Sequence, residues 1–151
     1  MVSSAHLRVR PAKKNDRQFV FEVRRAAFHA YVEQIAGWND TEQRLTADRE
    51  FDELPFEIVE EGWRPVGYLC VIHENECDFI EEIALLPEAQ GRGIGTQLLR
   101  DILQAAQKRG VPVRLSVFTN NPAQGLYARL GFEVKGIEHP RVRMEWSPNK
   151  T

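Results

Sequence analysis

The sequence lacks several features that mark other large classes of protein. No stretch approaches the roughly 18 consecutive apolar residues of a membrane-spanning helix, and the formal net charge is only -2. A charge this small creates no field that attracts a polyanion, so we expect neither nucleic acid nor a membrane as a partner. The first residues, Met1 to His6, do not form the apolar core of a signal peptide. The sequence therefore predicts a cytoplasmic protein.

Cysteine is also scarce, with two residues in the chain, Cys70 and Cys77. In a cytoplasmic protein both are expected to be free thiols. Together with His73 they form the pattern C-x-x-H-x-x-x-C, but no fourth ligand stands nearby in the sequence. A hairpin explains this spacing better than a metal site, so we expect no metal.

The composition is that of an ordinary globular protein. Hydrophobic residues make up 42% and charged residues 28% of the 151 residues, which predicts a single domain over residues 1–151. Apolar spacings of two and of three to four alternate along the chain in the order β-α-α-β-β-β-α-β-α-β-β. The expected strands cover residues 7–10, 56–60, 63–72, 79–86, 113–118, 132–134 and 142–146, and the expected helices cover 15–37, 41–51, 94–109 and a short segment from 122.

Local signals suggest how several of these elements begin or bend. Asn15, followed by Gln18 three residues later, predicts a cap for the first helix. Asp40 or Thr41 is expected to cap the second helix. Gly67 lies inside an expected strand and predicts a kink there.

A glycine-rich stretch, Gln90-Gly91-Arg92-Gly93-Ile94-Gly95, lies where an apolar strand is followed by an amphipathic helix. Glycines let a backbone approach a ligand closely, and the free N–H groups of a helix start attract anions, so a diphosphate group fits this position. The stretch is not the dinucleotide pattern G-x-G-x-x-G, because Thr96 stands three residues after Gly93. It is not a P-loop either, because no Gly-Lys-Ser/Thr follows.

A second segment, residues 120–132, reads N-N-P-A-Q-G-L-Y-A-R-L-G-F. The glycine-rich stretch resembles the signature Q/R-x-x-G-x-G/A of the GNAT family of N-acetyltransferases. The second segment matches that family's N-x-x-A-x-x-L-Y-x-x-L-G-F at every stated position. The two patterns occur in the family's order and at its usual separation, so the chain resembles a small single-domain GNAT protein.

This resemblance implies both a fold and an activity. The implied fold is α+β, an α/β/α sandwich with a mixed, mostly antiparallel sheet of about seven strands and four helices. The implied activity is transfer of an acetyl group from acetyl-CoA to a primary amine of a small molecule or peptide. The amine is expected to attack directly in a ternary complex, because neither cysteine lies beside the expected site.

The resemblance also assigns cofactor-binding residues. The glycine-rich loop is expected to hold the diphosphate, the strand before it to bind the pantetheine arm through its backbone, and the second segment to contribute an asparagine. The expected cofactor-binding residues are Ile83, Leu85, Leu86, Gln90, Gly91, Arg92, Gly93, Ile94, Gly95, Thr96, Asn120 and Tyr127.

Two residues are expected to be catalytic. Tyr127 matches the family tyrosine that points at the cofactor sulfur as a general acid. A phenol is a weaker acid than a thiol, so we expect Tyr127 chiefly to hydrogen-bond the developing thiolate; the alternative is a core aromatic residue. Glu82 resembles the glutamate base of the histone-acetylating branch, in the context Glu82-Ile83-Ala84-Leu85. Because Glu81 and Glu82 face opposite sides of a strand, only one can face the site. The alternatives for Glu82 are an ordinary strand carboxylate and a water chain acting as base.

The amine acceptor is less well defined by the sequence. Tyr31, Glu33 and Trp38 form an aromatic and acidic cluster near the end of the first expected helix, which suits an ammonium group; a solvated helix end is the alternative. The sequence leaves open a homodimer. It also leaves open a second function, a catalytically weak acyl-CoA-binding sensor of the same fold.

Overall fold

The computed structural model describes residues 6–149, which form seven strands and four α-helices joined by short connections. The strands are β1 (Leu7–Pro11), β2 (Phe56–Glu61), β3 (Arg64–His73), β4 (Asp78–Leu85), β5 (Val113–Phe118), β6 (Glu133–Glu138) and β7 (Arg141–Trp146). The helices are α1 (Arg17–Ala36), α2 (Asp40–Glu53), α3 (Ile94–Arg109) and α4 (Ala123–Arg129), with single 3-10 turns η2 (Lys14–Asp16) and η3 (Pro87–Ala89). The predicted element order is confirmed.

The strands form one open, mixed sheet in the order β1-β2-β3-β4-β5-β7-β6. Strands β4 and β5 are parallel, and the pairs β1/β2, β2/β3, β5/β7 and β6/β7 are antiparallel. This confirms the expected fold class. By its contacts the described chain divides into two compact units, residues 6–70 with 82–95 and residues 71–81 with 96–149.

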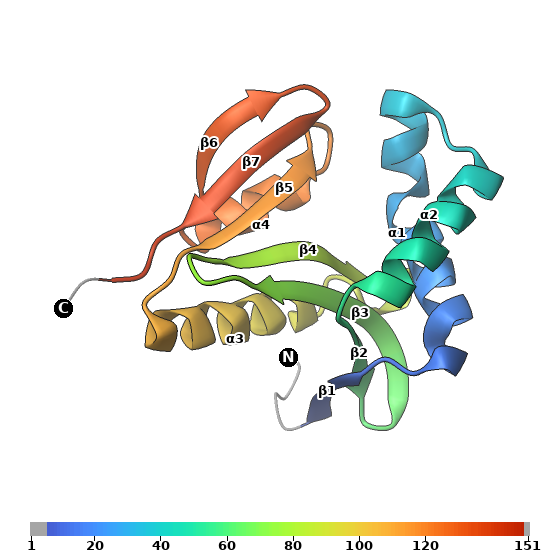
Figure 1. Cartoon of the computed structure of the whole chain (residues 1–151), viewed down its shortest axis with the longest axis horizontal. Helices are drawn as coiled ribbons and strands as arrows, with labels where there is room; N and C mark the ends of the chain where they lie inside the picture. The colour runs from blue at the N-terminus through green and yellow to red at the C-terminus, as the bar shows by residue number, and fades with distance from the viewer. Residues whose placement is uncertain (1–5, 150–151) are drawn as a thin grey trace. The chain divides into compact units, whose positions relative to one another are not determined.

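The first unit has its core between α1 and the strands of the sheet. Val20 and Val23 recur at helical spacing on α1 and pack in one cluster with Ile58 of β2 and Tyr68 of β3. Helix α2 lies beside α1, to which Arg17 ties it by an ion pair with Asp48 at 3.4 Å (Figure 1). The residues that α1 buries include Val20, Phe21 and Val23.

Gly67 lies where two neighbouring strands approach closely. A Cβ added at Gly67 would stand 2.3 Å from the carbonyl oxygen of Ala84 on β4, which no side chain tolerates. On the other side, the register with β2 shifts between Val59 and Glu60, as in a β-bulge. An irregularity in the pairing therefore lies opposite the glycine at which a kink is predicted, and the close packing against Ala84 requires glycine.

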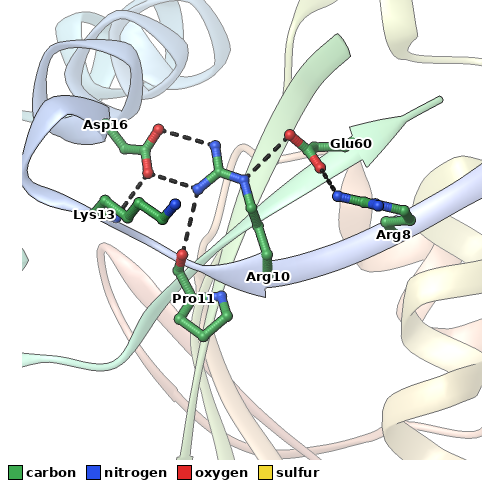
Figure 2. Close-up of polar contacts among 6 residues, drawn as sticks. All are labelled: Arg8, Arg10, Pro11, Lys13, Asp16 and Glu60. Carbon is green, nitrogen blue, oxygen red and sulfur yellow. Dashed lines mark hydrogen bonds and ion pairs between the residues drawn. The ribbon is translucent and has the colours of Figure 1, made fainter. Parts of the chain in front are cut away.

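A network of charged side chains fastens β1 to the rest of the first unit (Figure 2). Arg10 donates to both oxygens of Asp16, at 2.8 and 3.1 Å, and to Glu60 at 3.2 Å. Arg8 donates to the other oxygen of Glu60 at 3.1 Å. Asp16 and Glu60 are almost fully buried, so these bonds compensate the loss of water around both carboxylates.

Both helix caps in the first unit differ from the prediction. The Asp16 carboxylate accepts from the backbone N–H of Lys13 at 2.7 Å, so the pair predicted at Asn15 and Gln18 is wrong. Asn39 caps α2 by accepting from the N–H of Glu42 at 3.0 Å. Several consecutive residues at each site carry an acceptor side chain, and only the backbone path decides which of them reaches the free N–H groups.

In the second unit β7 lies between β5 and β6, with α4 packed beside them (Figure 1). The described pairing of β4 with β5 covers Asp78–Ile80 against Val113–Leu115, whereas β5 pairs with β7 over its whole length. Helix α3 buries the predicted face, including Leu98, Leu99 and Ala106. Within the described range no helix is both long and apolar enough to cross a membrane.

Cys70 and His73 lie on β3, and Cys77 lies in the connection before β4. Cys70 and Cys77 form no disulfide, as predicted, and both are buried. His73, which showed no partner pattern in the sequence, lies 2.7 Å from a carboxylate oxygen of the fully buried Asp78. Arg109 at the end of α3 donates to the same oxygen. Within residues 6–149 no group of three or more His, Cys, Asp or Glu side chains is arranged to hold a metal ion.

Candidate active site

The glycine-rich loop leads into the start of α3 through two glycines with positive φ angles. Gly91 and Gly93 adopt φ angles of +74° and +85°, a region that side chains with a Cβ rarely enter. An ideal Cβ at either position would have no atom within 4 Å, so the space beside this backbone is open. Helix α3 begins at Ile94, and its free N–H groups follow the loop directly. A diphosphate group fits this arrangement.

Neighbouring side chains hold the loop in place. Gln90 donates from its side chain to the carbonyl oxygen of Leu85 at 3.0 Å, which closes the turn after β4. Arg92 forms an ion pair of 2.6 Å with Glu61 at the end of β2. Ile94 is fully buried and anchors the first turn of α3, while Gly95 has an ordinary φ.

The end of β4 offers fewer free backbone groups than the sequence suggested. The N–H of Leu86 donates to the carbonyl of Val66 at 2.8 Å, and the carbonyl of Leu86 accepts from Ala89 at 2.9 Å. Ile83 and Leu85 are half-buried within β4. Because the Leu85 carbonyl also accepts from Gln90, an extended ligand that binds this strand through its backbone would use the groups of Ile83 or the N–H of Leu85.

Glu82 lies in a cluster formed by four elements of the first unit. Its Oε2 accepts from Nη2 of Arg24 on α1 at 2.6 Å and from the hydroxyl of Tyr68 on β3 at 3.1 Å. Nη2 of Arg24 also donates to Glu50 on α2 at 2.9 Å. The Arg24 side chain is 5% exposed, whereas those of Glu82 and Glu50 are 21% and 27% exposed. A buried cation thus stands behind two carboxylates that reach solvent.

The electrostatics of this cluster act on Glu82 in opposite directions. Burial raises the pKa of the Glu82 carboxyl above its ordinary value. The positive charge and hydrogen bond of Arg24 oppose this rise, the negative charge of Glu50 adds to it, and the hydrogen bond from Tyr68 opposes it. Burial also raises the pKa of Tyr68 well above that of a free phenol, so Tyr68 donates and does not ionise.

Tyr127 is a buried residue of α4 with a free hydroxyl. Its side chain is 8% exposed, and its ring packs edge-on against Phe132 at 5.6 Å between centroids. Burial raises the pKa of Tyr127 to about 12. Among residues 6–149 no partner hydrogen-bonds its hydroxyl. A protonated phenol without a protein acceptor can donate to a ligand.

The remaining residues expected to bind cofactor also lie in the second unit. Thr96 is half-buried in the first turn of α3, and Asn120 is half-buried just before α4. Asn121, which the sequence predicts as the helix cap, accepts from the N–H of Ala123 at 2.9 Å. Helix α4 begins one residue later than predicted, after Pro122.

The cluster expected to bind the acceptor is held by local hydrogen bonds. Glu33 accepts from the backbone N–H of Trp38 at 2.7 Å, and the Trp38 indole donates to Asp40 at 3.1 Å. The Trp38 ring packs against His29 at 5.0 Å between centroids. Tyr31 is half-buried on α1. These bonds close the turn between α1 and α2, and Arg25 also forms an ion pair with Asp40 at 3.6 Å.

Comparison with known proteins identifies the family. The model of the "Acetyltransferase (GNAT) family" matches residues 18–132. This chain belongs to the GNAT family. The match includes the glycine-rich loop, Glu82 and the segment that carries Tyr127.

Individual relatives agree with this assignment. An uncharacterized N-acetyltransferase of Methanocaldococcus jannaschii is 36% identical over 103 residues, which cover 62% of this GNAT chain and 45% of the relative. The N-alpha-acetyltransferase RimI of Mycobacterium tuberculosis is 41% identical over 66 residues, 43% of this chain and 40% of the relative. The chain thus spans less than half the length of each of these two curated relatives.

A solved structure shares the fold. The PaiA N-acetyltransferase of Thermoplasma acidophilum, solved in complex with coenzyme A, superposes with a TM-score of 0.74 at 18% identity. The superposition covers 93% of this chain and 98% of that structure. Family and relatives together support an acetyl-transfer function.

Sequence reasoning singled out residues within the GNAT signatures as site candidates but did not single out the residues around Glu82. Arg24, Glu50 and Tyr68 come from three separate elements, and their meeting at Glu82 depends on tertiary packing. One signal was present in the sequence. Arg24 stands on the apolar face of α1, four residues after Val20, where a charged residue rarely lies unless it is paired.

Proposed function

We propose that the protein is an N-acetyltransferase that moves an acetyl group from acetyl-CoA to a primary amine of a peptide or small molecule. The observation that carries the proposal is the loop at Gly91 and Gly93. It combines two positive φ angles, open space beside the backbone and a helix start, in a chain of the GNAT family.

The residues present fit coenzyme A as a ligand. N–H groups from Arg92 to Thr96 would hold its diphosphate with the help of the α3 dipole. Backbone groups of Ile83 and Leu85 would bind the pantetheine arm in the manner of an added strand. Asn120 would contact the same arm. When bound, acetyl-CoA supplies an activated thioester.

Glu82 is the proposed base. An alkyl amine with a pKa of about 10.4 is mostly protonated at pH 7, a deficit of about 4.6 kcal/mol, so a proton acceptor is needed. The Glu82 carboxylate would accept this proton, directly or through water, while the amine nitrogen attacks the thioester carbon and the carbon–sulfur bond breaks. Burial raises the pKa of Glu82, which makes it a stronger base than an exposed glutamate.

Tyr127 is the proposed donor to the leaving sulfur. With its pKa near 12 and that of a thiol near 8.5, complete proton transfer from the phenol would be uphill by about 5 kcal/mol. Tyr127 therefore acts by hydrogen-bonding the developing thiolate and retaining its proton. The thiolate takes its proton from solvent.

The attack is proposed to be direct, within a ternary complex. Both cysteines are buried, and burial raises the pKa of Cys77, which lowers its reactivity as a nucleophile. Incubation with acetyl-CoA and no acceptor, followed by mass spectrometry of the intact chain, should show no covalent acetyl group. Acetyl on Cys70 or Cys77 that transfers onward to an amine would contradict the direct route.

The proposed acceptor class is a primary amine, with the α-amino group of a peptide as its first candidate. The support is the similarity to an N-alpha-acetyltransferase, whose name describes that chemistry. Tyr31, Glu33 and Trp38 are proposed to receive the acceptor, because aromatic faces and a partly exposed carboxylate suit an ammonium group. Glu33→Gln should weaken binding of a cationic acceptor; unchanged KM would argue against this site.

A further inference from the structure

We propose that Arg24 is a positioning residue. Together with Tyr68 it fixes one oxygen of Glu82, so that the other oxygen faces the acceptor. Glu50 offsets part of the positive charge that Arg24 presents to Glu82. The proposal rests on the proposed function, since it assumes that Glu82 accepts a proton. It extends that function to three residues that lie outside the GNAT signatures.

The geometry gives the two oxygens of Glu82 different roles. Arg24 and Tyr68 both donate to Oε2, at 2.6 and 3.1 Å. Within residues 6–149 no hydrogen bond reaches Oε1. Two donors from different elements, α1 and β3, hold Oε2 in place. The proton of an amine can therefore be accepted by Oε1 without loss of these bonds.

The burial of Arg24 argues that it has more than a packing role. A guanidinium that is 5% exposed loses nearly all of its water, and an apolar side chain of similar volume would fill the same space at lower cost. Arg24 Nε is buried and has no hydrogen-bond partner among the described residues, so Arg24 is not fully satisfied by its surroundings. Its polar contacts are concentrated on Nη2, the atom that meets Glu82 and Glu50.

Glu50 is a second carboxylate that shares the positive charge of Arg24 with Glu82. One guanidinium faces two carboxylates, so the group as a whole carries a net negative charge when both are ionised. The charged and titratable groups that face Glu82 from the packed elements are Arg24 on α1, Glu50 on α2 and Tyr68 on β3. Glu50 draws part of the Arg24 charge away from Glu82 and repels its ionised form. Loss of Glu50 and loss of Arg24 should therefore act on Glu82 in opposite directions.

The first experiment follows the Glu82 carboxyl directly. The full chain is labelled with 13C at the glutamate carboxyl carbons, the Glu82 signal is assigned from Glu82→Gln, and its chemical shift is titrated with pH. We expect Arg24→Gln to raise the midpoint by about 1 pH unit or more, and Glu50→Gln to lower it. Tyr68→Phe should raise it by a smaller amount, and it keeps the test decisive should Arg24→Gln fail to fold.

The matched control is Arg17→Gln. Arg17 also joins α1 to α2 by ion pairs, with Asp48 and Asp52, but it has no contact with Glu82. Its substitution should leave the Glu82 midpoint unchanged. Equal shifts in Arg17→Gln and Arg24→Gln would reduce Arg24 to a general helix-packing role and overturn the proposal.

The second experiment measures thiol release from acetyl-CoA with a peptide that begins with alanine, across pH. In each variant the pH at which kcat falls on the acidic side should shift in the same direction as the titration midpoint of the Glu82 carboxyl. Arg24→Gln should lower kcat at least about tenfold. If Glu82→Gln abolishes turnover while the Arg24 and Glu50 variants do not shift the pH at which kcat falls on the acidic side, Arg24 is not a positioning residue. If Glu82→Gln turns over normally, the proposed base itself is wrong. The carboxyl titration needs no acceptor, and unmoved midpoints in all three cluster variants would overturn this proposal by themselves.

Discussion

At the scale of single residues, Tyr127 carries the most specific prediction. Tyr127→Phe removes a hydroxyl that has no hydrogen-bond partner within residues 6–149, so the fold should tolerate the change. We expect thiol release to fall about 10- to 100-fold, with coenzyme A affinity and Tm nearly unchanged. Turnover equal to wild type in a folded Tyr127→Phe protein would remove Tyr127 from the mechanism.

The pKa of Tyr127 adds a prediction about alkaline pH. Because burial raises this pKa to about 12, the phenol keeps its proton well past the pH at which a free tyrosine ionises. The rate of thiol release at saturating substrates should therefore show no fall due to Tyr127 up to about pH 10. If the rate of thiol release falls near pH 10 in wild type but not in Tyr127→Phe, the hydroxyl is more exposed than the structure indicates.

Glu82→Gln tests the proposed base. The amide keeps the size of the side chain and can still accept from Arg24, but it cannot take a proton. We expect kcat to fall about 100-fold or more. In wild type the acidic limb should lie above the range of an exposed glutamate, because burial raises the Glu82 pKa. If the fall of kcat at acidic pH persists unchanged in Glu82→Gln, that fall belongs to the titration of another group.

At the scale of elements, the glycine-rich loop can be tested against a glycine with the same backbone strain. Gly93 and Gly110 have φ angles of +85° and +72°, and neither has an atom within 4 Å of an ideal Cβ. Gly93→Ala and Gly110→Ala should each lower the free energy of unfolding by about 1–2 kcal/mol. Only Gly93→Ala should also weaken coenzyme A binding, which calorimetry measures. Equal affinity in both variants would contradict a role of the loop in binding.

The charge network of β1 and η2 (Figure 2) predicts how stability depends on pH. The hydrogen bond from Arg10 lowers the pKa of Asp16 below its ordinary value. Although burial opposes it, the bonds from Arg10 and Arg8 lower the pKa of Glu60 as well. Carboxyls with lowered pKa values stabilise the folded state above their unfolded pKa of about 4, and this stabilisation is lost as pH falls through the folded value.

Urea unfolding of wild type and Asp16→Asn measures this effect. Asp16→Asn should be less stable than wild type at pH 7 by about 1–3 kcal/mol, and the difference should shrink as pH falls below about 4. Arg17→Gln, which removes a more exposed pair, should lower stability less than Asp16→Asn does. A difference between wild type and Asp16→Asn that stays constant from pH 7 to pH 3 would contradict the account.

At the scale of the whole molecule, the sequence predicted the order of elements because each one carries its own periodicity. Alternating apolar residues define Val113–Phe118, and helical spacing defines Ile94–Arg109, independently of what each packs against. The glycine-rich loop was predictable for the same reason, since glycine is the residue that reaches the φ angles found at Gly91 and Gly93. Local physics determines these features.

The contacts that the sequence did not reveal are those made between distant segments. Arg24 and Glu82 are separated by 58 residues, and their ion pair exists because α1 packs against the strand that carries Glu82. Arg109 meets Asp78, 31 residues away, for a similar reason. The caps at Asp16 and Asn39 were misplaced because several neighbouring side chains can accept a hydrogen bond and only the backbone path selects one.

The most direct test of the account is thiol release from acetyl-CoA with a panel of amines. The panel holds polyamines, amino acids, aminoglycosides, lysine peptides and peptides with free N-termini, and Tyr127→Phe is assayed beside wild type. We predict release with one class of amine, reduced at least about tenfold in Tyr127→Phe. Coenzyme A binding without release for any amine would favour the acyl-CoA-binding sensor. Absence of both binding and release would contradict the proposed acetyl transfer.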